Sequence, residues 1–135
     1  MNNARFATAI HILVLLAMKR DELLSSDFIA GSININSAIV RKELSSLRDY
    51  GLIQSKEGKG GGTRLARGAE HIYLSDVYRA VKQSPLLGRF NDPNVNCPIG
   101  RQINHNIKEI NQRAEQALLE RLRGISLADF VKQFN

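Results

Sequence analysis

Apolar residues recur with helical spacing near the start of the chain and predict a helix over residues 4–19. The main stripe of this helix consists of Phe6, Ile10, Leu13, Val14 and Ala17. The apolar surface is widened by Ile12, Leu15 and Leu16. A helix that is apolar on most sides needs cover on most sides, and a second subunit could supply part of that cover.

A short second helix is predicted over residues 24–30. Either Ser25 or Ser26 can cap its start, because a serine hydroxyl accepts a hydrogen bond from the first turn. We expect Phe28 and Ile29 to face the core.

A basic third helix is predicted over residues 36–50. The segment 31–36, which begins at Gly31, is rich in turn formers and links the second helix to the third at a sharp angle. Asn36 caps the third helix and Gly51 ends it. The face that packs inward carries Val40, Leu44 and Leu47. The residues that point elsewhere are Ser37, Arg41, Ser45 and Arg48. A short helix, a tight turn and a second helix with outward polar residues are typical of a helix-turn-helix.

A β-hairpin is predicted directly after the basic helix. Residues 52–56 and 63–67 are strand-length and partly alternating, and the glycine-rich, cationic segment 57–62 separates them. A two-stranded ribbon after a recognition helix forms a wing, and glycines without a Cβ allow close approach to a sugar-phosphate backbone.

The second half of the chain predicts a supporting helix, a linker and one long helix. Residues 74–82 form a short helix with a capping serine, Ser75, and residues 83–97 are irregular because they hold two of the three prolines. A helix over residues 98–122 follows and ends at Gly124, and Ser126 caps a last turn. Its narrow apolar seam consists of Ile103, Ile107, Ile110, Ala114 and Ala117. Such a seam pairs most simply with a copy of itself, although it could lie along its own domain.

These elements predict a mainly α fold with a small β-hairpin. We divide the chain into a winged helix-turn-helix domain at residues 1–83, a linker at 84–99, and a dimerisation helix with a C-terminal helix at 100–135. At 135 residues the chain can bury a core without metals or disulfides.

Charge points to an anionic partner. The net charge is +6, and residues 36–67 carry seven Lys and Arg against three acids, hence four of those six charges. A basic helix and hairpin suit the phosphate backbone of double-stranded DNA, although a charge run is also found on ordinary solvated surfaces. The apolar run 7–18 is shorter than the roughly 20 residues that cross a bilayer, and no signal-peptide cleavage site follows it. We therefore expect no membrane span. The single cysteine, Cys97, cannot form an internal disulfide, so we expect a reducing, cytoplasmic location.

Little else in the sequence carries chemistry. The segment Gly58-Lys59-Gly60 lacks the Ser or Thr of a phosphate-binding loop, and a strand is expected where such a loop opens a helix. We expect no enzyme, no metal and no cofactor, with a small nucleotide-binding enzyme and a winged-helix protein-interaction module as alternatives. The single cysteine, Cys97, precedes Pro98 at a predicted helix start. It is either a redox sensor with a lowered thiol pKa or a small buried hydrophobic residue, and we favour the latter.

Two segments carry a resemblance to a known family. Residues 47–53 (LRDYGLI) and 58–67 (GKGGGTRLAR) resemble the signature of the Rrf2 family of bacterial winged-helix transcription regulators. Residues 74–81 and the long helix after residues 97–101 (CPIGR) are also similar to it, so the resemblance covers nearly the whole chain.

The resemblance implies a homodimer that binds a roughly palindromic operator, and we expect the protein to act as a repressor. It places the helix at 36–50 in the major groove and the wing at 57–63 near the minor groove. It also implies that the long helix crosses the same helix of the second subunit and that helix 4–19 helps to cover this crossing. Family members often sense iron-sulfur status, nitric oxide or cysteine supply. Cluster-binding members carry three cysteines before the long helix, whereas this chain has only Cys97, so we expect no cluster. Some members place an arginine where Glu57 stands here. The effector stays unknown. The residues expected to contact DNA are Ser26, Asn36, Ser37, Arg41, Ser45, Arg48, Lys59, Gly60, Gly61 and Arg64.

Overall fold

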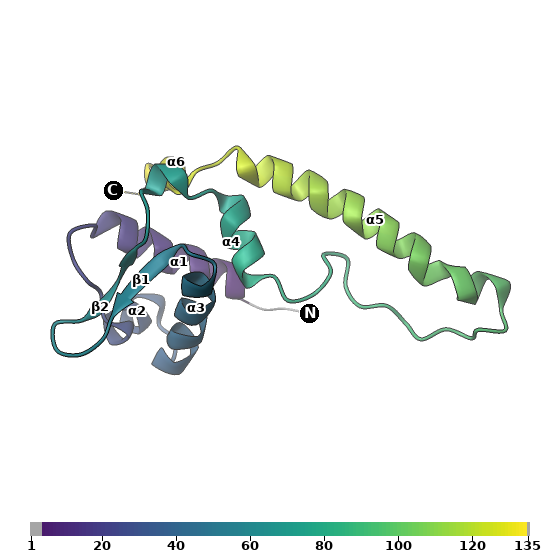
Figure 1. Ribbon diagram of the computed structural model, residues 1–135, viewed down its shortest axis with the longest axis horizontal. Helices are drawn as coiled ribbons and strands as arrows, with labels where there is room; N and C mark the ends of the chain where they lie inside the picture. The colour runs from purple at the N-terminus through teal and green to yellow at the C-terminus, as the bar shows by residue number, and fades with distance from the viewer. Residues whose placement is uncertain (1–3, 135) are drawn as a thin grey trace.

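Five elements pack against the first helix, and a long helix projects away from them (Figure 1). The computed structural model describes residues 4–134. Its elements are α1 (Arg5–Met18), α2 (Ser26–Ile33), α3 (Ser37–Asp49), β1 (Ile53–Lys56), β2 (Gly62–Leu65), the 3-10 helix η1 (Ala69–His71), α4 (Leu74–Val81), α5 (Pro98–Arg123) and α6 (Leu127–Val131). The mainly helical fold with one hairpin and a long C-terminal helix is confirmed.

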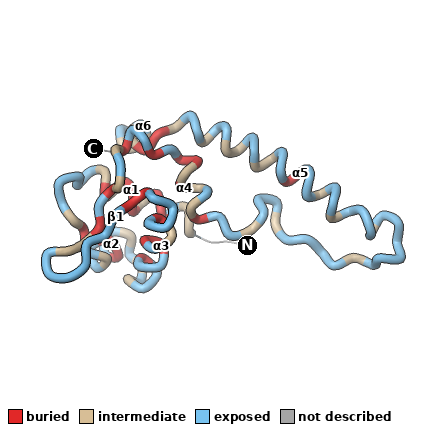
Figure 2. Tube along the Cα trace, viewed as in Figure 1, coloured by how far each residue is buried: buried red, intermediate tan, exposed pale blue. Residues whose placement is uncertain are grey.

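The core sits around α1, which contacts α2, α3, α4, α6 and β2. Ile12, Leu13 and Leu16 are almost fully buried. The cover that the apolar sequence of α1 demands therefore comes in large part from the same chain. We call α1 to α4, the hairpin and α6 the head of the molecule. In Figure 2 the buried residues are concentrated in the head, whereas α5 is largely exposed.

The second helix differs from expectation in one side chain and in its end. Ser25 is the cap, because its hydroxyl oxygen accepts a hydrogen bond from Phe28 N at 3.1 Å. Ile29 is buried as expected, but Phe28 is 47% exposed, so its predicted core position is wrong. The turn of the helix that brings Ile29 inward directs Phe28 outward, where Lys19 Nζ lies 5.7 Å from its ring centroid. The helix also continues past Gly31 to Ile33.

The cap predicted for α4 is also wrong. Ser75 is buried and lies inside the helix rather than before it. The Asp76 carboxylate instead accepts a hydrogen bond from Tyr73 N at 2.9 Å, which satisfies a backbone donor at the helix start. Acid side chains in a first turn also interact favourably with the helix dipole.

The hairpin is antiparallel, with Ile53 opposite Leu65 and Lys56 opposite Gly62. Strand β2 also pairs with the segment before α2, because Leu24 and Thr63 of β2 exchange two backbone hydrogen bonds of 3.0 and 2.9 Å. The wing is thereby fixed to the head of the molecule at its base.

The chain returns to the head after α5. Leu127 of α6 is fully buried in the core, and Leu127 N donates to Ile72 O while Leu74 N donates to Ile125 O. Hence α6 lies in space with the N-terminal elements, although our division by sequence groups it with α5. None of the helices formed by residues 4–134 combines the length and hydropathy needed to cross a membrane.

Candidate nucleic-acid interface

Helix α3 has one buried face and one exposed polar face. Val40, Leu44 and Leu47 are buried, as their spacing predicts. Arg41, Ser45 and Arg48 are exposed, and Ser37 is half-buried at the helix start. The exposed residues follow one another at spacings of three and four, so they line one stripe of the helix. Such a stripe suits contacts in a DNA major groove.

The start of α3 is held by its own side chains. Asn36 Oδ1 accepts a hydrogen bond from Ala38 N at 2.7 Å, which confirms the predicted cap. Arg41 Nη1 lies 3.4 Å from Ser37 Oγ one turn away, so the guanidinium is directed along the exposed stripe towards the N-terminus. The cap occupies one oxygen of Asn36 and leaves its amide NH2 as a donor.

An ion pair that sequence reasoning missed holds α3 against α1. Arg5 Nε lies 3.0 and 2.9 Å from the two carboxylate oxygens of Glu43, and Arg5 Nη2 lies 2.8 Å from Oε1. Arg5 Nη2 also donates to Ser46 Oγ at 3.0 Å. The Glu43 side chain is only 3% exposed and that of Arg5 17%. The hydrogen bond to Glu43, opposed by burial, raises the pKa of Arg5, so the pair stays ionised and fixes the rotation of α3.

A second contact, also missed, joins α3 to the wing. Arg48 donates from Nε and Nη2 to Ser55 Oγ at 3.2 and 2.9 Å, and Ser55 Oγ lies 3.2 Å from Thr63 Oγ1 on the facing strand. Figure 1 shows α3 and the hairpin side by side on the same end of the molecule. The arginine, predicted as a DNA contact, therefore also sets the angle between the recognition helix and the wing.

Two glycines of the wing, Gly61 and Gly62, lie too close to backbone atoms to carry a side chain. A Cβ on Gly61 would lie 2.1 Å from Lys56 O, and one on Gly62, at φ +152°, would lie 2.8 Å from Leu24 O. Both positions therefore need glycine for packing, whatever the wing binds. Lys59 and Gly60 are exposed at the tip.

Arg64 lies on the outer side of the hairpin, where Nε is 3.4 Å from Oε1 of its cross-strand partner Gln54. The structure thus brings the predicted residues of α3 and of the wing to one end of the head. Ser26 stands apart from them as the first residue of α2. Gln54, Ser55 and Lys56 of β1 adjoin these wing residues, and their polar type on an exposed strand was the sequence signal for them.

Helix α5 leaves its apolar seam uncovered. Ile103 and Ile110 are 38% and 58% exposed, and Ala117 is exposed, whereas Ile107 and Ala114 are half-buried. The only buried residue of this helix, Asn111, accepts a hydrogen bond from Leu87 N at 2.8 Å. The dimerisation role of the seam stays a prediction.

Cys97 is exposed, so the interpretation that it is a small buried hydrophobic residue is wrong. It is the N-cap of α5, and its sulfur lies 3.4 Å from Gly100 N. The exposure follows from its place in the extended segment before α5, which packs little against the head. A sensor role stays a prediction.

A phosphate-binding loop for a nucleotide is not formed here. The segment 57–61 connects two antiparallel strands, and Gly62 already belongs to β2. A phosphate site of the common kind instead opens a helix, whose N-terminal N–H groups hold the anion.

Comparison with known proteins places these features in one family. Residues 2–133 match the model of the Rrf2 family, described as iron-dependent transcriptional regulators. The chain is 38% identical over 130 residues to YwnA of Bacillus subtilis, named as a proposed HTH-type transcriptional regulator, and the match covers 96% of both chains.

Solved structures agree in fold. A crystal structure titled as that of a proposed DNA-binding protein shares 35% identity and a TM-score of 0.74, covering 93% of this chain and 97% of the other. CymR, the global cysteine regulator of Bacillus subtilis, matches with a TM-score of 0.72 at 21% identity, and the match covers 100% of this chain and 98% of CymR.

The iron in the family description does not fit the donors found here. Among residues 4–134 no group of three or more His, Cys, Asp and Glu side chains could hold a metal ion. Iron-sulfur clusters take four ligands, mostly cysteine thiolates, and this chain has one cysteine.

Proposed function

Because the chain belongs to the Rrf2 family of transcription regulators, we propose that it binds DNA as a homodimer on a palindromic operator. The protein is a DNA-binding transcription regulator of the winged helix-turn-helix class. Its proposed mode of binding DNA is supported by one observation. The exposed polar stripe of α3 is joined to the cationic wing through the Arg48–Ser55 hydrogen bond, so helix and wing form one surface.

In this proposal α3 enters the major groove. Arg41 contacts a base edge, since arginine to guanine is the commonest specific contact, and Ser37, Ser45 and the Asn36 amide bind nearby bases or phosphates. Lys59 and Arg64 of the wing bind the sugar-phosphate backbone, and the backbone N–H groups of Gly60 and Gly61 lie beside it. Arg48 and Ser26 bind phosphates at the edges of the site.

The exposed seam of α5 supports the dimer. At 1.5 Å per residue its 26 residues span about 39 Å, long enough to cross a second copy over several turns. A two-fold axis through such a crossing presents two α3 helices to two half-sites, which is why the operator should be palindromic.

We further propose that the protein is a repressor, that it acts in the cytoplasm, and that it is not an enzyme. A dimer seated on an operator that overlaps a promoter excludes the polymerase from it. The relatives matched here are transcriptional regulators, which supports a role without catalysis.

The test starts from the unmodified protein. DNA selected from random fragments should yield one palindromic sequence, and fluorescence anisotropy should then measure affinity for it and for a scrambled duplex. Arg41→Ala should weaken the selected site by about 1–3 kcal/mol and random DNA far less. Lys59→Ala should weaken both alike and lower the salt slope by about one.

The matched control is Arg121→Ala, an exposed arginine of α5 that belongs to neither α3 nor the wing, which should change neither affinity. Equal losses on both duplexes for Arg41→Ala would make it a phosphate contact. Failure to select any sequence, with weak binding alike to all DNA, would count against the operator proposal.

A further inference from the structure

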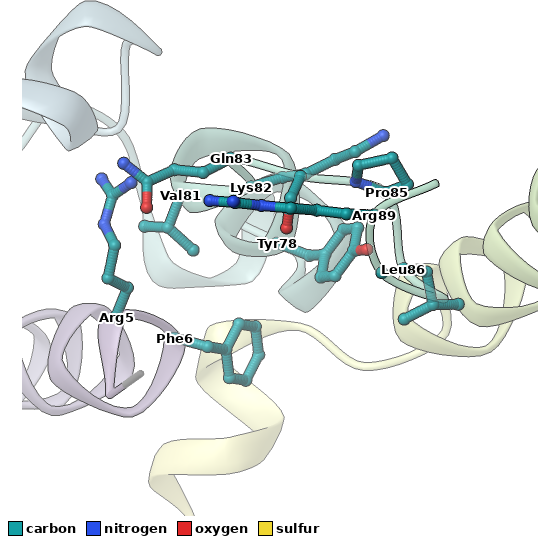
Figure 3. A pocket seen from close by; sticks show the side chains of 11 residues that line it. Arg5, Phe6, Tyr78, Val81, Lys82, Gln83, Pro85, Leu86 and Arg89 are labelled. Carbon is teal, nitrogen blue, oxygen red and sulfur yellow. The ribbon is translucent and has the colours of Figure 1, made fainter. Parts of the chain in front are cut away.

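A cavity of about 850 Å³ lies behind the DNA-facing surface. It is bounded by the start of α1, the end of α4 and the first residues of the linker (Figure 3). Its volume falls in the range of small-molecule binding sites, which is roughly 300–1,000 Å³. The residues contacting DNA in the proposal above do not line it, so it is a separate site.

The lining combines apolar walls with positive charge. Phe6, Val81 and Leu86 provide apolar surface, and Arg5, Lys82 and Arg89 provide cations. No Asp or Glu is among the described residues that line the cavity. In Figure 3 the Arg89 side chain extends across the cavity, and the described part of the chain offers its guanidinium no carboxylate within ion-pair distance. This lining favours a small anion with an apolar body.

Two cavity cations also hold the elements that the function depends on. Arg5 makes the bidentate pair with Glu43 of α3, and Lys82 pairs with Glu115 of α5. Tyr78, which also lines the cavity, donates to Glu115 Oε2 at 3.1 Å. Burial and the Glu115 hydrogen bond raise the pKa of Tyr78, so its hydroxyl stays a donor. One face of the cavity is therefore tied to the recognition helix and another to the α5 helix.

We propose that this cavity binds a small organic carboxylate with an apolar body and that the bound anion changes DNA affinity. The carboxylate pairs with Arg89 and lies beside Arg5 and Lys82, so it shares these two cations with Glu43 and Glu115 and shifts the balance of the contacts that hold α3 and α5. The proposal rests on the proposed function only for its second half, because carboxylate binding needs no DNA. Coupling between sites typically changes affinity by about 5- to 150-fold.

The experiment uses the full chain and three probes, benzoate, phenylacetate and indole-3-acetate. Their uncharged amides, benzamide, phenylacetamide and indole-3-acetamide, are the matched control ligands. Binding is measured by calorimetry and thermal shift, and DNA affinity by anisotropy with and without each probe. Arg89→Gln removes one of the three cations that line the cavity, the one expected to pair with the ligand, and Arg79→Gln, an exposed arginine of α4 outside the cavity, is the control variant.

We expect at least one carboxylate to bind while its amide does not, Arg89→Gln to weaken it about tenfold or more, and Arg79→Gln to leave it unchanged. The proposal is overturned if no carboxylate binds, if amides bind equally well, or if both variants behave alike. Carboxylate binding with unchanged DNA affinity overturns the effector role alone. A protein that binds the carboxylate but selects no DNA sequence would refute the operator proposal and leave the cavity assignment standing.

Discussion

Loss of the Arg5–Glu43 pair should strongly destabilise the fold at the inner side of α3. The perturbation is Arg5→Met, which keeps an unbranched apolar stem and removes the guanidinium and its charge. It leaves the Glu43 carboxylate, whose side chain is 3% exposed, without the guanidinium that contacts both of its oxygens. An unpaired buried charge is costly because water cannot reach it.

The expected magnitude follows from burial. Breaking a buried ion pair by removing one partner costs about 3–5 kcal/mol. Because Arg5 is 17% exposed, the pair lies at the edge of the core, and we expect about 3 kcal/mol. Glu43→Gln should cost less, about 1–2 kcal/mol, since the amide still accepts a hydrogen bond and Arg5 can turn towards water. The double variant Arg5→Met/Glu43→Leu should lie within about 1 kcal/mol of the unmodified protein.

The assay is urea unfolding followed by far-UV circular dichroism, at one fixed protein concentration because dimerisation shifts apparent stability. Arg20→Met, at the other end of the α1 region and exposed, is the matched control and should stay within about 0.5 kcal/mol. Glu43→Leu is measured alone as the second single variant of the cycle. If the losses of Arg5→Met and Glu43→Leu simply add in the double variant, the two side chains do not interact energetically, and the reasoning from the buried pair is refuted.

Three further predictions follow from the fold. Ile110→Asp should convert the dimer to a monomer in analytical ultracentrifugation, because it puts a charge on the exposed seam of α5, and a persisting dimer would exclude this seam. Gly62→Ala should destabilise the fold by about 1–3 kcal/mol, because φ is +152° and the added Cβ would meet backbone atoms. Gly31→Ala, which has open space around it in α2, should instead stabilise the fold by roughly 0.5–1 kcal/mol. Equal effects of the two substitutions in urea unfolding would contradict this. The pKa of Tyr78 is raised by burial and then by Glu115, so its stabilising contribution is complete below the pKa of an unfolded tyrosine and is lost as pH rises through the folded pKa. Tyr78→Phe should therefore flatten the loss of stability above about pH 10, and an unchanged pH profile would disprove this.

Local pattern was sufficient for most of the secondary structure. The spacing of Val40, Leu44 and Leu47 sets the inner face of α3, and Asn36 begins the helix where its side chain can cap it. The glycine segment between two alternating runs predicted the hairpin. Each of these inferences depends on residues within a few positions of one another.

The failures involve side chains whose surroundings come from elsewhere in the chain. Phe28 and Ile29 are neighbours in the same short helix, and only the packing of that helix on α1 and α3 decides which of the two is buried. Ser75 has the residue type of a cap, yet Asp76 supplies the first-turn contact. Cys97 could be assigned as buried or exposed only once the path of the linker was known.

By itself the sequence determined the order of elements, the basic stretch proposed to face DNA, and the family. Tertiary structure decided how α3 is held, because Arg5 and Glu43 are 38 residues apart and no periodicity links them. It also decided that Arg48 bridges to the wing, that α6 returns to the core, and that a cationic cavity opens between α1, α4 and the linker. The physical reason is that periodicity specifies which face of an element is apolar, whereas only packing specifies which faces and charges meet.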